Sequence, residues 1–325
     1  MDKKKRVLSG VQPSGDLHLG NYFGAIKQHI EMQKDPDLEP FYFIADYHAL
    51  TTVTNPKLLN SWTLDVALGY LALGLDPKKS VFFRQSDTPE VCELMWLLCT
   101  VTGMGLLQRA HSYKDKVAQG ITPSVGLFNY PILMAADILA PKANLVPVGQ
   151  DQVQHVEMAR DMAGYFNQTY ENVFPLPEYR LTPMAKVPGI DGQKMSKSYK
   201  NTLPIFEEGK GLRKKIMSIV TDSTPVEKPK DPETCNLFAL YKLFANEKEQ
   251  KEMSDRYLKG GLGYGTVKQE LFERMESYFK KAREERKRLE KDTDYVEDVL
   301  KKGGEKAKGI SQKTLQSARK ACGLK

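Results

Sequence analysis

Short apolar runs alternate with longer amphipathic stretches through the first half of the chain. Each run has the length of a buried strand and ends at glycine or polar residues. Helical patterns follow three of the four runs. This alternation is typical of a parallel sheet covered by helices on both faces. The expected strands are residues 7–11, 41–46, 81–85 and 145–149, and the expected helices end at residue 32 or span 56–74 and 151–166.

The pattern changes after about residue 205, where strand candidates give way to Lys/Glu-rich helical stretches. Glycines interrupt these stretches at 260–265 and 303–304. The first glycine cluster is not preceded by a strand, which a dinucleotide-binding loop requires, so it predicts a turn between helices. We expect an α/β catalytic domain over residues 1–200, with a doubly wound, Rossmann-like parallel sheet. An all-helical domain over 201–325 follows, and its last helix can pack back on the first domain.

The net charge of +7 lies entirely in the C-terminal part of the chain. Residues 1–204 hold 20 basic and 20 acidic side chains, whereas residues 205–325 hold 28 and 21. A neutral domain joined to a basic one is typical of a catalytic domain with a second domain that binds a polyanion. Solubility explains Lys-rich helices equally well.

Composition and the N-terminal residues point to the cytoplasm. The chain is 41% hydrophobic and 27% charged, which is ordinary for a globular protein. No apolar run approaches the ~18–20 residues of a membrane span. The basic start leads into residues 7–10 without the long apolar region of an export signal. The four cysteines form no C-x-x-C pair, so we expect reduced thiols, a cytoplasmic location and no contact with a membrane.

The first candidate for chemistry is the glycine-bearing loop after residue 10 and the helix start His18-Leu19-Gly20-Asn21. A helix N-terminus at the carboxyl edge of a sheet offers free N–H groups and a favourable dipole to a phosphate. Gly20 would let a flat base approach the backbone. His18 and Asn21 lie on one turn, so both can reach one phosphate group. Taken alone, the pattern is more often explained by a structural loop with a helix cap.

The second candidate is Lys194-Met195-Ser196-Lys197-Ser198. It follows the flexible lead-in of residues 189–192. Two lysines three apart with a hydroxyl between them form a cationic clamp for a triphosphate and for departing pyrophosphate. An exposed basic loop is the commoner explanation of such a pair. We expect the two candidates to fold against the same triphosphate, with Gly20 near Met195.

These two stretches resemble the HIGH and KMSKS motifs of class I aminoacyl-tRNA synthetases. With GVQPSGDLHLGNYFGA, ADYHALT, NYPILMAADIL and VPVGQDQVQHVEMARD, they resemble the tryptophanyl-tRNA synthetase family in the family's order over residues 10–198. The first motif ends in Asn21 rather than His, which is usual in this family. Some members carry an iron–sulfur site, but Cys235 and Cys322 have no close partners. We therefore expect no iron–sulfur cluster and no structural metal.

One carboxylate, Asp137, stands in the apolar helical run of residues 131–140. A buried carboxylate needs a donor, because burying it unpaired costs on the order of several kcal/mol. A structural salt bridge or a cap would satisfy it. The resemblance instead implies that Asp137 accepts the indole N–H of tryptophan, which rejects phenylalanine.

The resemblance also implies roles for other residues. Tyr130 and Gln152 match positions that hold the substrate's α-amino group, Gln12 lies near the reacting carboxylate, and Asp151 suits the ATP ribose. Lys116 matches a phosphate-contacting lysine, with Lys114 as the competing choice. Met134, Val146 and Val148 line the indole slot or are simply core, and His48 closes the pocket or satisfies the core. The expected sets are, for catalysis, His18, Lys116, Lys194 and Lys197; for ATP, Gln12, Pro13, Ser14, His18, Gly20, Asn21, Gly149, Gln150, Asp151, Val187, Lys194, Met195, Ser196, Lys197 and Ser198; and for tryptophan, Leu8, Gln12, His48, Tyr130, Met134, Asp137, Val146, Val148 and Gln152.

The resemblance implies an enzyme that activates L-tryptophan with Mg²⁺-ATP and transfers it to the 3′ end of tRNA(Trp). It also implies a homodimer with the tRNA spanning both subunits and an anticodon-binding role for the helical domain. Three alternatives stay open: a tyrosyl-tRNA synthetase, a non-catalytic RNA-binding paralogue, and a small-molecule nucleotidyltransferase of the same fold.

Overall fold

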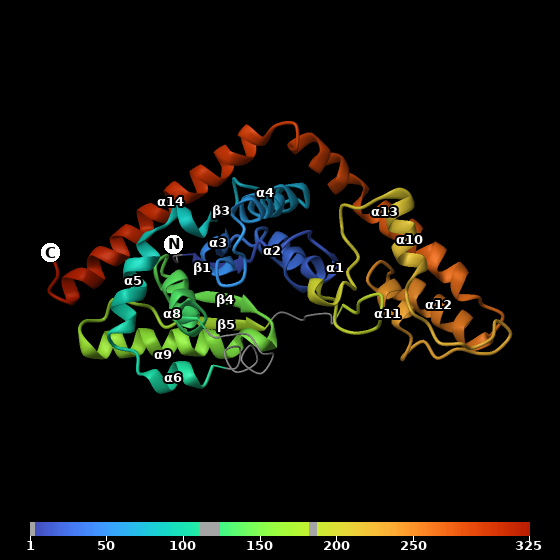
Figure 1. Ribbon diagram of the computed structural model, residues 1–325, viewed down its shortest axis with the longest axis horizontal. Helices are drawn as coiled ribbons and strands as arrows, with labels where there is room; N and C mark the ends of the chain where they lie inside the picture. Colours follow the sequence, from blue (N-terminus) through green and yellow to red (C-terminus); the bar gives the residue numbers. More distant parts are fainter. Residues whose placement is uncertain (1–3, 111–123, 182–186) are drawn as a thin grey trace. The chain divides into compact units, whose positions relative to one another are not determined.

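The computed structural model describes residues 4–110, 124–181 and 187–325. The chain forms two compact units (Figure 1). Unit 1 comprises residues 1–14, 29–183 and 292–325, and unit 2 comprises residues 15–28 and 184–291. These boundaries do not coincide with a division at residue 200, so the two domains expected from the sequence stay a prediction.

Unit 1 is built on a parallel sheet with strand order β3-β2-β1-β4-β5. Val11 pairs with Ile44, Phe41 with Val81, and Leu145 with Glu178. In such a sheet ligands bind beyond the carboxyl ends of the strands, where the strand order reverses, and here that point lies between β1 and β4. The strands are β1 (Lys5–Val11), β2 (Leu38–Ile44), β3 (Val81–Arg84), β4 (Leu145–Val148) and β5 (Glu178–Leu181).

Local sequence signals fix where the helices of unit 1 begin. The Asn55 side chain accepts hydrogen bonds from two amides of the first turn of α4, and Pro56 occupies the first helical position. The Ser124 hydroxyl caps α8 in the same way. Helix α5 packs on α8, α8 on α9, α9 against β5, and α4 against β2. The helices are α3 (Asp46–Ala49), α4 (Pro56–Ala72), α5 (Glu90–Cys99), α6 (Met104–Gln108), α8 (Val125–Leu139), α9 (Val153–Thr169) and α14 (Thr293–Ala321), with 3-10 turns at Gln85–Asp87 and Gln150–Gln152.

Helix α14 runs through Gly303 and Gly304, so the expected interruption at these glycines is wrong. The helix packs on β3, α5 and the turn after β3 (Figure 1). A Cβ on Gly303 would lie 1.9 Å from the Phe82 carbonyl oxygen, and one on Gly304 would lie 2.7 Å from the Asp87 Cβ. Gly303 therefore allows the helix to lie directly on the β3 backbone, and Gly304 allows it to lie against the turn that follows, so both glycines have a packing role.

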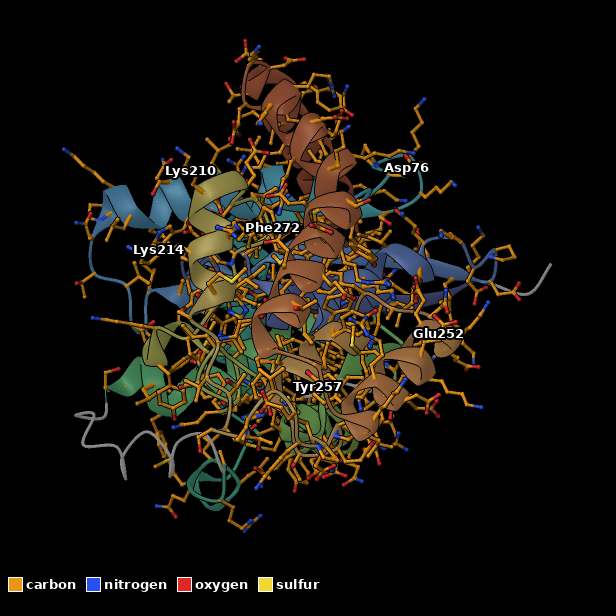
Figure 2. All side chains as sticks on the ribbon, turned by 90° about the vertical axis from the view of Figure 1, so that its right-hand side faces the viewer. Asp76, Lys210, Lys214, Glu252, Tyr257 and Phe272 are labelled. Atoms are coloured by element: carbon orange, nitrogen blue, oxygen red, sulfur yellow. The ribbon has the colours of Figure 1, made fainter. Side chains whose placement is uncertain are left out.

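Unit 2 is helical apart from its loops. Val267, Leu271, Met275 and Phe279 repeat every four residues along α13 and are fully or almost fully buried. Figure 2 shows α10 and α13 with Lys210, Lys214 and Phe272 labelled. Tyr22 and Phe23 pack edge-on against Phe279 and Phe244, which places the first helical segment in this unit. The elements are α1 (Leu19–Asn21), a π-helical turn (Tyr22–Ile26), α2 (Lys27–Met32, which continues into unit 1), a 3-10 turn (Lys197–Tyr199), α10 (Gly209–Met217), α11 (Asn236–Lys242), α12 (Glu247–Lys259) and α13 (Tyr264–Leu289).

The four expected strands and three expected helices are confirmed, as is the Rossmann-like sheet with a helical C-terminal region. The glycines at 260–265 do form a turn between helices, α12 and α13. None of the helices in the described residues combines the length and apolar character needed to cross a bilayer.

Candidate active site

The start of α1 is joined to the chain just beyond the Lys194–Ser198 loop. The Leu19 amide donates a 3.0 Å hydrogen bond to the Leu203 carbonyl, and His18 forms an antiparallel bridge with Pro204. His18 precedes the first residue of α1, and its amide donates to Asn21 Oδ1 at 3.1 Å. The side-chain oxygen of Asn21 is thus already hydrogen-bonded within the turn, and its side-chain NH₂ group is the part that can donate to a ligand.

The two sequence motifs meet in unit 2. A Cβ on Gly20 would lie 3.0 Å from two atoms of the His18 ring and 3.5 Å from Met195 Cβ. Lys197 Nζ donates a 2.7 Å hydrogen bond to the Gly15 carbonyl oxygen. Although about 180 residues separate them in sequence, the loop before α1 and the Lys194–Ser198 loop form one surface.

His18 is electrically neutral at physiological pH. Its side chain is buried, with 6% of the residue exposed. Burial and the positive charge of Lys197 lower the pKa of His18 from 6.5 to about 4. Near neutral pH the imidazole can therefore donate a hydrogen bond to an anion but adds no positive charge, so Lys197 supplies the cation at this point.

The loop that carries Lys194 and Lys197 is a tight hairpin. Pro188 and Lys194 form an antiparallel bridge, and the Met195 amide donates to the Val187 carbonyl at 3.0 Å. Gly192 takes a φ of +85°, which suits glycine. The lead-in expected to be flexible is thus a hydrogen-bonded turn. Met195 and Val187 are buried, Ser196 and Lys197 are half-buried, and Lys194 and Ser198 are exposed.

In unit 1, Asp137 lies at the centre of a buried polar cluster. Its carboxylate accepts hydrogen bonds of 2.9 Å from His48 Nε2 and from Gln85 Nε2, the latter reaching both oxygens. Burial raises the pKa of Asp137, and the hydrogen bond from His48 opposes that rise. The donor that the sequence required is therefore present. This pairing is compatible both with a structural carboxylate and with one held in place to receive an indole N–H.

The other residues expected to bind tryptophan also lie in unit 1. Tyr130 Oη is hydrogen-bonded to His155 Nε2, and the Tyr130 ring lies 6.0 Å from the His48 ring, edge to face. Of the remaining members of this set, Gln12 and Gln152 follow the carboxyl ends of β1 and β4, and Leu8, Met134, Val146 and Val148 lie in or against the apolar core of unit 1. The residues expected to bind ATP that follow the same two strand ends are Pro13, Ser14, Gly149, Gln150 and Asp151.

The sequence reasoning missed Gln85, which holds Asp137, and the pair Asp46 and Ser86 beside it. Two Ser86 groups, the amide and the hydroxyl, donate to the Asp46 carboxylate. Gln85 is 1% exposed and directly follows β3. A polar residue at the carboxyl end of a buried strand was the available signal, because that edge of the sheet carries ligands.

Two lysines considered for phosphate binding lie outside the described residues. Lys116 and Lys114 fall in residues 111–123, which the structure does not describe. Within the described ranges, no group of three or more His, Cys, Asp or Glu side chains is placed to hold a metal ion.

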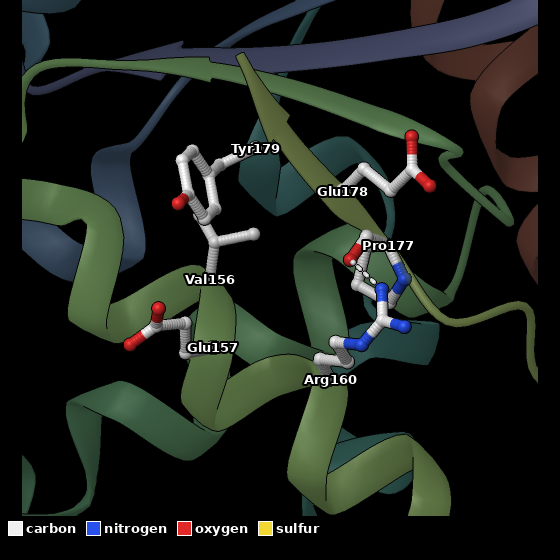
Figure 3. A pocket seen from close by; sticks show the side chains of 6 residues that line it. All are labelled: Val156, Glu157, Arg160, Pro177, Glu178 and Tyr179. Carbon is white, nitrogen blue, oxygen red and sulfur yellow. Dashed lines mark hydrogen bonds between the residues drawn. The ribbon is translucent and has the colours of Figure 1, made fainter. Parts of the chain in front are cut away.

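A cavity of about 370 Å³ between α9 and β5 (Figure 3) is lined by Val156, Glu157, Arg160, Pro177, Glu178 and Tyr179, and contains none of the expected site residues.

The fold, the paired loops of unit 2 and the buried polar cluster around Asp137 are found in a chain that matches one family of enzymes. The family model of class I tRNA synthetases for tryptophan and tyrosine (W and Y) matches residues 1–280, and the chain belongs to this family. The tryptophan–tRNA ligases of Rhodopirellula baltica and Fusobacterium nucleatum are 54% and 53% identical to it, over 98% of this chain and 100% and 98% of theirs. A crystal structure of tryptophanyl-tRNA synthetase from Campylobacter jejuni with ADP and tryptophan has a TM-score of 0.91 and 52% identity, covering 98% of this chain and 100% of that one.

Proposed function

We propose that this chain is a tryptophan–tRNA ligase that works in two steps. A carboxylate oxygen of tryptophan attacks the α-phosphorus of ATP, pyrophosphate leaves, and tryptophanyl-adenylate forms. A terminal ribose hydroxyl of tRNA(Trp) then attacks the carbonyl carbon of the adenylate, loses its proton, and AMP leaves. The observation that carries the proposal is the proximity of Gly20 to Met195, because it places a helix start and a cationic loop on one surface.

The phosphate-binding residues act by position and charge. The reaction needs no covalent nucleophile, since phosphoryl chemistry of this kind depends on alignment and on stabilising spread negative charge. Lys194 and Lys197 would neutralise the charge that grows on pyrophosphate, and neutral His18 would donate a hydrogen bond beside them. Lys116 is proposed for the same phosphates. ATP enters as its Mg²⁺ complex, with phosphate oxygens as the main ligands of the metal.

The buried cluster of unit 1 supports the choice of tryptophan. Asp137 is held by Gln85 and His48 and would accept the indole N–H. An amino acid without that N–H would leave the buried carboxylate short of a donor, which costs more than the loss of one hydrogen bond. Tyr130 and Gln152 are proposed to bind the α-amino group, and Asp151 the ATP ribose.

We further propose that the basic helices of residues 205–325 bind the anticodon region of the tRNA. Exposed lysines such as Lys210 and Lys214 on α10 suit contacts with phosphates (Figure 2). The proposal includes a homodimer and a cytoplasmic location, where ATP and tRNA are available.

ATP–pyrophosphate exchange across the twenty amino acids tests the proposed function. Exchange driven by tryptophan is expected. Exchange driven by tyrosine instead would make the chain a tyrosyl-tRNA synthetase. Retained tRNA binding without exchange would favour a non-catalytic RNA-binding paralogue. Deleting residues 205–325 cannot test the third alternative, a small-molecule nucleotidyltransferase, because α14 contributes Ala307, Leu315 and Ala318 to the core of unit 1.

A further inference from the structure

Asn201 is a buried polar residue that lies two residues after the 3-10 turn Lys197–Tyr199. It is 1% exposed. Its Oδ1 accepts a 2.8 Å hydrogen bond from the Ser196 amide. Its Nδ2 donates to Asp191 Oδ1 at 2.8 Å and to the Lys194 carbonyl at 3.2 Å. One planar amide therefore satisfies one hydrogen-bond donor and two acceptors inside the loop.

These hydrogen bonds fix the backbone on both sides of Met195. The Lys194 carbonyl and the Ser196 amide flank that residue, and Lys197 follows immediately. The backbone carbonyl of Asn201 also accepts a 3.0 Å hydrogen bond from the Ile190 amide at the start of the turn. The distance and direction between Lys194 and Lys197 thus depend on a side chain outside the lysine motif.

The surroundings admit little besides asparagine at this position. A Cβ on Gly189 would lie 2.3 Å from both Cγ and Nδ2 of Asn201, so the glycine makes room for the amide. Aspartate has the same shape, but it cannot donate to the Lys194 carbonyl and would place a second carboxylate against Asp191. Alanine would leave the Ser196 amide and the Lys194 carbonyl without these partners.

We propose that Asn201 is a positioning residue for adenylate formation, and that it acts through Lys194 and Lys197 without touching either substrate. The inference rests on the proposed function. The amide holds the loop in the shape that presents both ammonium groups to the phosphates before ATP arrives. Its loss leaves the lysines in place but lets their spacing vary, and small misplacements of groups that act on a transition state are costly.

The first test compares Asn201→Ala, Asn201→Asp and Asn167→Ala in single-turnover adenylate formation with the full-length protein. Asn167 is a matched control, because its amide also braces a loop: it accepts from the Val173 and Phe174 amides and donates to the Phe174 carbonyl. Both Asn201 variants are expected to form adenylate about 10–100-fold more slowly, with KM for tryptophan within about twofold of wild type. Asn167→Ala should keep the wild-type rate. A wild-type rate in Asn201→Ala would overturn the proposal.

A double variant tests whether Asn201 acts through the lysine. If it does, Lys197→Ala with Asn201→Ala should be slowed little beyond Lys197→Ala alone, because the two changes remove one function. Losses that multiply would overturn the proposal. Hydrogen exchange of residues 187–203 provides a readout independent of activity. The Ser196 amide should exchange faster in Asn201→Ala than in wild type, and unchanged exchange would overturn the positioning role. Lack of tryptophan-dependent exchange of pyrophosphate in the wild-type protein would contradict the proposed function separately.

Discussion

Lys197 donates a hydrogen bond from its ammonium group to the backbone carbonyl of Gly15, at 2.7 Å. Gly15 lies in the turn before α1, and Lys197 begins the 3-10 turn of its own loop. The bond joins the two segments that the sequence nominated separately. It also uses a lysine proposed to neutralise pyrophosphate, so that ammonium group is already oriented before a nucleotide binds.

Replacing Lys197 with alanine should slow adenylate formation by about 10²–10³-fold, the usual loss for one transition-state donor. The reason is the loss of positive charge beside the departing pyrophosphate. Single-turnover kinetics with ATP and tryptophan measures it. Lys210→Ala removes an exposed lysine on α10 and should leave this rate unchanged, which controls for net charge. An unaltered rate in Lys197→Ala would count against its role.

Replacing Asp137 with alanine should weaken tryptophan recognition more than ATP binding. The substitution removes the proposed acceptor for the indole N–H and leaves Gln85 and His48 without their partner. KM values for the two substrates in pyrophosphate exchange provide the comparison. Equal losses for tryptophan and ATP would identify a structural carboxylate instead.

Gly303→Ala should destabilise the protein by about 1–3 kcal/mol, the usual cost of overpacking. A methyl group there would collide with the Phe82 carbonyl, which is backbone and cannot rotate away. Gly309 is the matched control in the same helix, because in the described part of the chain a Cβ there would meet no atom within 4 Å. Gly309→Ala should stabilise by about 0.5–1 kcal/mol. Urea unfolding followed by circular dichroism measures both, and equal effects would refute the packing explanation.

Stability should fall as the pH drops below 6.5. His29 is buried, stacks on Tyr42 at 4.5 Å and hydrogen-bonds Tyr70, and burial lowers its pKa from 6.5 to about 3. Between these values the unfolded chain binds a proton that the folded chain does not, so acid favours unfolding. At pH 5 the loss from His29 is about 2 kcal/mol relative to pH 7.5.

Urea unfolding of wild type and His29→Gln at pH 7.5 and pH 5 checks this expectation. The variant should be less stable at pH 7.5, because it loses the stacked ring, but its stability should change less between the two pH values. His18, with its pKa lowered to about 4, contributes in the same direction and remains in the variant. Identical pH dependence in the two proteins would contradict the assignment to His29.

Much of the fold could be predicted from the sequence because the buried strands are short apolar runs. Strand β5 could not, since its residues Glu178–Leu181 are all exposed and alternate polar and apolar positions over only four residues. Its pairing with β4 rests on backbone hydrogen bonds, which composition does not record. The prediction of a helix break at Gly303 and Gly304 was wrong for a related reason. In sequence, a glycine that ends a helix cannot be distinguished from one that lets a helix pack closely.

The candidate site shows the same division. His18, Gly20, Lys194 and Lys197 could be nominated because their chemistry and spacing are local. Asn201 could not, because its role depends on how the loop folds back on itself and not on a recognisable spacing. Gln85, the partner of Asp137, had only the signal of its position after a buried strand. Asparagine and glutamine are also common in loops, so residue type alone gave no signal. Roles for the nominated residues stay predictions until the variants are measured.

The return of α14 to the sheet has a consequence for biosynthesis. Ala307, Leu315 and Ala318 complete a core whose other members are made much earlier. A ribosome that has translated the first 290 residues has therefore produced every strand, but β3 and α5 still lack their cover. We expect the nascent sheet to remain incompletely folded until the last segment leaves the exit tunnel. Until then, chaperones that recognise exposed apolar surface can bind it.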